Sequence, residues 1–394
     1  DKSSGRLSIG NSSIEGIVPG HKMDRMNINL RASTQVTDFL SFDGKINYVH
    51  TEGNQRPTLG QSSENVSRTF AQMGRYVPMD WLKEYYETTG EYGKWPAVRY
   101  NPYYVVNELK NHDYRDRFLG YVSANLKITD WLNLMGRAGA DTYTEFAERT
   151  WPVGSSGSSN SQGRIENSIR HYKDLNADVL LSASKEVSST ISLSGSLGAS
   201  LLTQRRDRIS MDARKFKAPG VYHVSNATEY HPGASLWEKE MQSVYGTAQV
   251  AYKNYLFLDI TGRNDWSSTL GLDNQSFFYP SLAGSFVFTD AMAIDENILS
   301  FGKIRASWAQ VGNDSSPYLT QAGYTSYTTT YGGLSLAAKS GQMPLFDLKN
   351  ELTESWEIGA DLRFFKNRLS IDATYYNGNT TNQILPTTIS NASG

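Results

Sequence analysis

Residues 351–376, ELTESWEIGADLRFFKNRLSIDATYY, alternate between apolar and polar or small side chains on both sides of a short polar turn. The apolar members are Trp356, Ile358, Ala360, Leu362 and Phe364 before the turn and Leu369, Ile371, Ala373 and Tyr375 after it. Successive side chains of a β-strand point to opposite faces, so this period of two predicts two strands joined as a hairpin. Each run has about ten residues, which suits a tilted strand crossing a bilayer better than the shorter strand of a soluble sandwich.

The same hairpin pattern recurs along most of the chain. Its short turns are expected near residues 37–38, 129–132, 184–189, 253–254 and 366–367, and the fifth hairpin has a longer connection at residues 289–299 that could hold a short helical turn. Two of these turns carry nearly the same sequence, TDFL at residues 37–40 and TDWL at residues 129–132, as a repeating architecture would produce. With a partial strand before the first hairpin, the pattern predicts about 12–13 long antiparallel strands.

The longest connection, residues 53–111, is expected to be an ordered extracellular loop. Residues 64–86 are predicted to be helical, with a break at Pro78. The second half of the loop is rich in Tyr and Trp, and this aromatic content argues against disorder. An ordered connection of this length is usually functional.

The composition fits long strands with polar loops and excludes several classes of protein. The 394 residues include 24 Tyr, 8 Trp and 33 Gly, as expected for long strands flanked by aromatic belts. A net charge of -2 offers no basic field for nucleic acid, and the absence of cysteine excludes disulfides, thiol catalysis and Fe–S clusters. No apolar run of about 18 residues exists, so transmembrane helices are not expected.

Short turns alternate with long connections, and this asymmetry predicts an all-β fold, a transmembrane antiparallel β-barrel. Such barrels have short periplasmic turns and long extracellular loops, with apolar side chains facing lipid and polar ones facing the lumen. Phe39, Trp131 and Tyr255 stand beside short turns, where an aromatic girdle is expected. In the hairpin at 351–376, Ile358 and Ile371 are therefore expected to face lipid.

Several segments resemble one family of membrane proteins. These are YKNY at 252–255, GRNDWSS at 262–268, FYPSLAGS at 278–285, LSFGKIRASWAQVGN at 299–313 and NELTESWEIG at 350–359. Their succession resembles the SusC/RagA-type TonB-dependent transporters of the Bacteroidetes outer membrane. The resemblance is strong over residues 242–380 and weaker, but compatible in topology, over residues 1–204.

The resemblance implies a larger protein and an active function. It implies a barrel of about 22 strands around a plug, in which residues 1–394 form part of one barrel domain without the plug, signal peptide or final strands. The implied function is TonB-dependent import of oligosaccharides or peptides across the outer membrane. The implied partners are a SusD-like surface lipoprotein, the TonB–ExbB–ExbD system acting through N-terminal regions, and outer-membrane lipid. No cofactor is implied.

Two other functions are compatible with parts of the pattern. One is a passive porin or a structural or adhesin barrel, and the other is a soluble β-rich carbohydrate-active enzyme. An enzyme is not expected, because the six His are scattered and the chain has no HExxH motif, GxSxG elbow or phosphate loop. No metal site is expected either.

Aromatic side chains in the expected extracellular segments are candidates for substrate binding. They are Trp95, Tyr100, Tyr103, Trp151, Tyr222 and Trp237. Aromatic rings offer flat apolar faces with polar tips, which suit stacking on sugars or packing on peptides. The alternative is that these rings order the loops or contact a partner.

Charged and polar residues within the family segments are expected to face the lumen. They are Arg263, Asp265, Ser267, Ser268, Lys303 and Arg305. One interpretation places the first four near the substrate, and the other makes them a strand end with ordinary lumen charges. Lys303 and Arg305 are candidates for ion pairs with a plug, or for a solvated wall.

Overall fold

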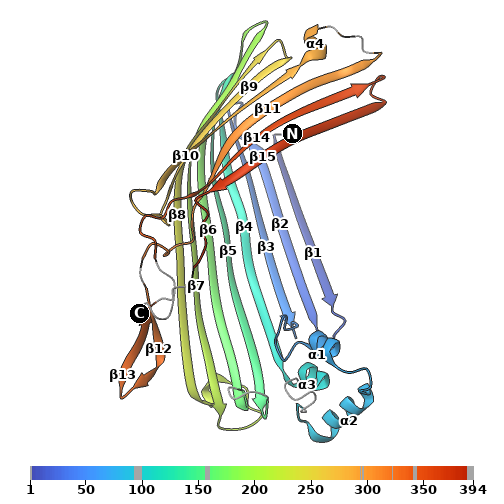
Figure 1. Cartoon of the computed structure of the whole chain (residues 1–394), viewed down its shortest axis with the longest axis vertical. Coiled ribbons are helices and arrows are strands. Elements are labelled where there is room, and N and C mark those ends of the chain that lie inside the picture. The colour runs from blue at the N-terminus through green and yellow to red at the C-terminus, as the bar shows by residue number, and fades with distance from the viewer. Residues whose placement is uncertain are drawn as a thin grey trace.

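A single antiparallel sheet makes up most of the protein (Figure 1). The computed structural model describes residues 2–92, 100–155, 160–292, 294, 297–321, 323–339 and 344–387. Within them, 13 strands pair in chain order, from β1 to β11 and on to β14 and β15. The strands are β1 Ser3–Glu15, β2 Lys22–Gln35, β3 Leu40–Asn54, β4 Lys110–Thr129, β5 Leu132–Val153, β6 Gln162–Ser188, β7 Ile191–Phe216, β8 Ala227–Tyr252, β9 Leu256–Ser267, β10 Ser276–Val287, β11 Leu299–Asn313, β14 Glu351–Phe364 and β15 Leu369–Thr381.

The connections divide between the two ends of the sheet as the sequence predicts. Short turns close the hairpins β2–β3, β4–β5, β6–β7, β8–β9 and β14–β15, and a longer connection that contains α4 Phe288–Met292 joins β10 to β11 at the same end of the sheet. The remaining longer connections lie at the other end, where Figure 1 shows α1 Val66–Gln72, α2 Met79–Thr89 and α3 Pro102–Glu108 below the first strands. The expected 12–13 strands and the six hairpins are therefore confirmed, and the sheet is an open arc whose edges are β1 and β15.

The strand register separates an apolar face from a charged face. In the last hairpin, Ile358 lies opposite Tyr375, and Leu362 lies opposite Ile371. On the other face, Asp361 lies opposite both Lys303 and Asp372. Ile358 is 57% exposed although it is apolar, which is what a lipid-facing side chain shows in the absence of lipid.

Several strands are much longer than the sequence predicts. The alternating runs predict strands of about ten residues, yet β6 has 27 residues and β7 has 26. A bilayer needs only about 9–11 residues of a tilted strand. On the outer face, the continuous apolar row is interrupted by charged residues from Lys173 and Arg205 onward, so we place the additional residues beyond the lipid on the side of the long loops. In that part of each strand the apolar alternation persists only at separated positions such as Ile169 and Ile209.

Short helices lie in the connections. They are α1 Val66–Gln72, α2 Met79–Thr89, α3 Pro102–Glu108 and α4 Phe288–Met292, with a 3-10 turn η1 at Val224–Asn226. Pro78 forms the N-cap of α2, which confirms the predicted break in the helical segment. The two-stranded sheet of β12 Tyr324–Tyr331 and β13 Leu334–Lys339, and helix α3, were not predicted. None of the described helices combines the length and apolar character needed to cross a membrane.

Candidate functional site

The loop between β3 and β4 folds into a small aromatic core against the end of β5. Its buried members are Tyr100, Tyr104, Leu109 and Trp151. The indole Nε1 of Trp151 donates a hydrogen bond of 2.6 Å to Glu64 Oε1, and the Tyr104 hydroxyl lies 2.9 Å from Ser155 Oγ. In the described part of the loop, this core buries apolar surface that holds α2 and α3 in place.

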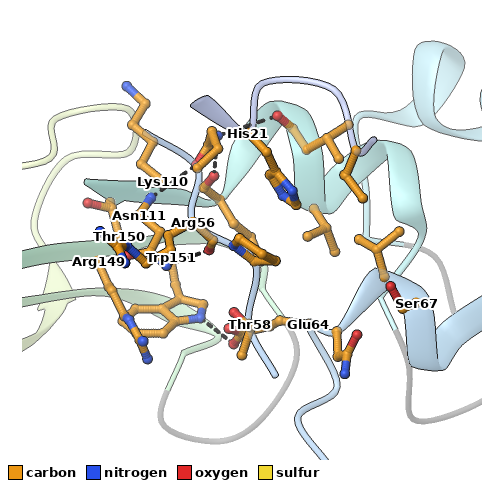
Figure 2. A pocket seen from close by; sticks show the side chains of 18 residues that line it. His21, Arg56, Thr58, Glu64, Ser67, Lys110, Asn111, Arg149, Thr150 and Trp151 are labelled. Atoms are coloured by element: carbon orange, nitrogen blue, oxygen red, sulfur yellow. Dashed lines mark hydrogen bonds between the residues drawn. The ribbon is translucent and has the colours of Figure 1, made fainter. Parts of the chain in front are cut away.

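A cavity beneath this loop is too small to receive an oligosaccharide or a peptide. It lies between the loop and the ends of β4 and β5, where Figure 2 shows the hydrogen bond from Trp151 to Glu64. Arg56 closes one side through two hydrogen bonds of 2.6 and 2.7 Å to Asp113. The volume of about 40 Å³ holds a few water molecules, whereas drug-sized ligands occupy several hundred cubic ångströms.

Two tyrosines make this loop sensitive to alkaline pH. Burial, together with the hydrogen bond to Glu108, raises the pKa of Tyr86 to about 12, and burial raises the pKa of Tyr104 to about 12. Above about pH 10 the unfolded loop releases these protons while the folded loop retains them. Their contribution to the stability of the loop is therefore complete below about pH 10 and is lost as the pH rises through about 12.

We therefore expect the loop to open between about pH 10 and pH 12 while the sheet remains folded. Proteolysis of residues 55–109 and the fluorescence of Trp151 should both report the opening. In a Tyr86→Phe, Tyr104→Phe double variant, this alkaline step should disappear. An unchanged step in the double variant would contradict the assignment.

The five aromatic candidates that the structure describes do not converge on one site. Trp95 lies outside the described residues. Tyr100 and Trp151 are 2% and 5% exposed, so their rings serve the loop core and offer no open face. Tyr103 is half-buried on α3, and Tyr222 is half-buried with Lys110 Nζ 5.1 Å from its ring centre. Trp237 stands apart, on β8, where the guanidinium of Arg206 lies 4.4 Å from its ring centre.

The family-segment residues Arg263 and Asp265 form a tight lumen cluster on β8, β9 and β10. Arg263 Nε donates a 2.8 Å hydrogen bond to Asp265, and its terminal nitrogen donates one of 2.8 Å to Ser243 Oγ. The hydroxyl of Tyr279 also donates to Asp265. Asp265 is only 3% exposed, so its carboxylate is occupied by the protein's own donors. This geometry favours a role in fixing three neighbouring strands.

Ser267 and Ser268, later in the same segment, anchor a loop. The hydroxyl of Ser267, 1% exposed, donates to Asp314 at the end of β11. Lys239 Nζ lies 2.7 Å from the same carboxylate, with both side chains largely buried. The Ser268 hydroxyl accepts a 2.9 Å hydrogen bond from the backbone N–H of Glu240. The long connection that begins at residue 314 is thereby fastened to β8 and β9.

Lys303 and Arg305 lie on the lumen face near the short-turn end of β11. Arg305 donates hydrogen bonds of 2.7 Å to Asp372 and to Thr374 on β15. Asp372 is on the strand beyond the neighbouring one, so the bond crosses β14. This part of the wall therefore satisfies Arg305 internally, and a plug contact remains a proposal for Lys303.

Strands β5 to β8 carry a row of four large side chains on the lumen face. Of the four, only Trp237 was identified from the sequence. Tyr143, Tyr172, Arg206 and Trp237 lie directly opposite one another on adjacent strands. The rings of Tyr143 and Tyr172 are stacked with centroids 4.9 Å apart. The residues are scattered over almost a hundred positions, so only the strand register brings them together.

These observations define the class of protein. A sheet of long antiparallel strands, apolar on its outer face, charged on its inner face and asymmetric in its connections, is the wall of a large transmembrane β-barrel. A family model described as "TonB dependent receptor-like, beta-barrel" matches residues 156–394, and the chain belongs to this family. Its members are outer-membrane receptors and transporters, not enzymes.

Related sequences carry names from the same family. The chain is 30% identical over 159 residues to TonB-dependent receptor P26 of Formosa agariphila, which covers 39% of this chain and 16% of the relative. It is 30% identical over 175 residues to TonB-dependent receptor P3 of the same organism, covering 43% of this chain and 17% of the relative. The chain thus spans less than a fifth of the length of these relatives.

Solved structures share the fold over the whole chain. The RagAB peptide transporter superposes with a TM-score of 0.83 at 18% identity, covering 100% of this chain and 44% of that one. The siderophore receptor PiuA from Acinetobacter baumannii superposes with a TM-score of 0.55 at 14% identity, covering 95% of this chain and 53% of that one. At these identities the likeness concerns the fold alone.

Proposed function

We propose that this chain is part of the barrel wall of an importer of the SusC/RagA type, in the outer membrane of a Bacteroidetes-like bacterium. One observation carries the proposal: the superposition on the RagAB peptide transporter covers 100% of the chain with a TM-score of 0.83, against 0.55 for the siderophore receptor. Residues 1–394 then belong to one barrel domain, and the loop at 53–111 faces the cell exterior.

The proposed cargo is an oligosaccharide or a peptide, captured under a SusD-like surface lipoprotein. The tall wall supports this idea, because strands such as β6 and β7 continue well past the lipid and enclose space above the membrane. That extended lumen face carries charged and aromatic groups, including Arg117, Arg206 and Trp237. Such a surface suits a polar oligomer better than a small apolar ligand.

The proposed energy source is the TonB–ExbB–ExbD system of the inner membrane. In a barrel of about 22 strands the lumen is wide, and a plug domain must close it to prevent leakage. A plugged lumen has no open diffusion path, so external work has to move the plug before cargo passes. A passive porin would have no such requirement.

Uptake by the full-length gene product tests this proposal. Cells that express it would be given a fluorescently labelled pool of oligosaccharides and, separately, a labelled pool of peptides. We expect accumulation of one pool that depends on the gene and is lost in cells without TonB. Accumulation that persists without TonB would favour the passive porin, and a surface lipoprotein should co-purify with the protein if the partner is assigned correctly.

A further inference from the structure

One arginine in the lumen wall lies between two aromatic rings and, among the residues that the structure describes, has no acidic partner. The guanidinium of Arg206 lies 5.3 Å from the ring centre of Tyr172 on one side and 4.4 Å from that of Trp237 on the other. Tyr172 in turn stacks on Tyr143, and the guanidinium of Arg115 lies 5.4 Å from the Tyr143 ring centre. These side chains form a continuous stack across β4 to β8, which we call the Arg206 row.

Other arginines on this face are neutralised by carboxylates, whereas Arg206 is not. Arg117 is paired with Asp141, and Arg170 lies 2.9 Å from Glu145. Among the described residues, no carboxylate comes within ion-pairing distance of Arg206, or of Arg208 two residues further along the same face. Both are exposed. The lumen wall therefore presents two uncompensated positive charges side by side.

Arg206 keeps N–H donors for a ligand. Its guanidinium lies over the rings of Tyr172 and Trp237 and is hydrogen-bonded to the Tyr172 side chain, but a guanidinium has five N–H donors and this one is exposed to the lumen. Stacking also restricts the rotamers of a long side chain, so less entropy is lost when the guanidinium binds an anion. A planar guanidinium with free N–H groups matches a carboxylate through two parallel hydrogen bonds.

The row lies beyond the lipid, at the level of the long loops. Its neighbours on the outer face are Lys173 and Arg205, and Arg205 pairs with Glu238 at 2.7 Å. Charged residues at this level place it above the apolar band. A ligand that enters the lumen from outside would meet the Arg206 row early on its path.

We propose that the Arg206 row is a binding site for a carboxylate-bearing oligomer, with the carboxylate on Arg206 and the chain lying across the strands. Neighbouring strands are about 4.8 Å apart, so the donors of the row are spaced along an elongated ligand. The same chemistry is offered by an acidic oligosaccharide and by an acidic peptide. The proposal rests on the import function above and specifies its cargo.

Calorimetric titration of the purified full-length protein in detergent tests the site. The probes are tetragalacturonate with a neutral galactose tetramer, and tetraglutamate with tetraglutamine. We expect the acidic member of at least one pair to bind more tightly than its neutral partner. Arg206→Gln should lower the affinity for that acidic ligand on the order of tenfold to a hundredfold and leave the affinity for the neutral ligand unchanged.

Arg205→Gln is the matched control, because it removes the same charge from the adjacent residue on the outer face. It should retain the affinity of the unmodified protein. The sugar pair and the peptide pair distinguish the two sources of the carboxylate. If neither acidic probe is preferred, or if Arg205→Gln and Arg206→Gln weaken binding equally, the proposal is wrong. If Arg206→Gln fails to fold, Arg206→Met replaces it, because it also removes the charge, and unchanged affinity in that variant likewise overturns the proposal.

This experiment separates the site from the proposed function. Binding is measured without TonB, so loss of the charge preference with intact TonB-dependent uptake would refute only the Arg206 site. If removal of the Arg206 charge lowers the affinity for the acidic ligand but uptake persists without TonB, only the proposal of active import would be refuted.

Discussion

Asp314→Ala is expected to weaken the anchoring of the connection between β11 and β14 by about 3–5 kcal/mol. The carboxylate of Asp314 lies 2.7 Å from Lys239 Nζ and accepts the hydroxyl proton of Ser267. The side chains of Lys239 and Asp314 are only 14% and 6% exposed. Without Asp314, the ammonium group of Lys239 would stay buried without a counter-ion. An uncompensated buried charge is what makes the loss of one partner of a buried ion pair strongly destabilising.

Hydrogen exchange of the amides around residues 313–316 would measure this effect as a free energy of local opening. Proteolysis within residues 316–350 should accelerate in parallel, because the connection is released from β8 and β9. The transmembrane part of the sheet should be unaffected, since its strand pairing does not depend on this contact.

Glu238→Ala provides the matched control for Asp314→Ala. Glu238 pairs with Arg205 on the outer face at 2.7 Å, close in sequence to Lys239, but the two side chains are 47% and 51% exposed. Exposed ion pairs contribute about 1 kcal/mol or less. A loss in Asp314→Ala as small as that in Glu238→Ala would show that burial of the Lys239 pair has no energetic consequence.

The alternating faces of the strands were predictable because they follow from local sequence. Apolar residues such as Ile358 and Ile371 alternate with polar neighbours along each strand, and short polar turns such as residues 366–367 mark the hairpins. Lipid enforces this pattern strongly, since a slip of one residue would turn every charge toward the hydrocarbon. The pairing within each hairpin was equally predictable, because a short turn forces the two strands that it joins to pair.

The upper halves of the strands were not predictable in the same way. Beyond Lys173 on β6 and Arg205 on β7, water replaces lipid on the outer face, and the apolar alternation loses its physical cause. Strand pairing continues there because backbone hydrogen bonds and cross-strand pairs, such as Arg164 with Asp212 at 2.8 Å, sustain it. The sequence pattern thus predicts where the membrane is and does not predict where the strand ends.

The contacts of individual site residues depend on long-range register. The importance of the segment with Arg263 and Asp265 is readable in the sequence, but its link to Asp314, 49 positions beyond Asp265, is not. Similarly, Trp237 was identified as an aromatic candidate, yet its partner Arg206 is on another strand and carries no local signal. The burial of Tyr100 and Trp151 could not be predicted, because Tyr100 precedes β4 in the chain and Trp151 follows it, so only the folded loop brings them together.

Ile358→Arg is expected to cost about 2–4 kcal/mol of folding free energy in a lipid bilayer. Ile358 lies on the lipid-facing row, six residues before the end of β14 at Phe364, and its neighbours on that face are Ala306 and Tyr375. Near the middle of the hydrocarbon, an arginine has neither water nor an anion within reach, so its charge is poorly solvated. Folding of the full-length protein into vesicles, followed by urea titration, would measure the loss.

Glu357→Arg places the same side chain on the adjacent residue and on the opposite face. Glu357 is exposed on the lumen face and lies opposite Ser307 and Tyr376, so the new guanidinium remains hydrated. Asp361 would be a poorer control, because its carboxylate is bound to Arg363 at 3.0 Å. We expect Glu357→Arg to change stability by about 0.5 kcal/mol or less. Equal losses in the two variants would overturn the assignment of lipid and lumen faces, and with it the orientation of the Arg206 row, because the same alternation fixes both.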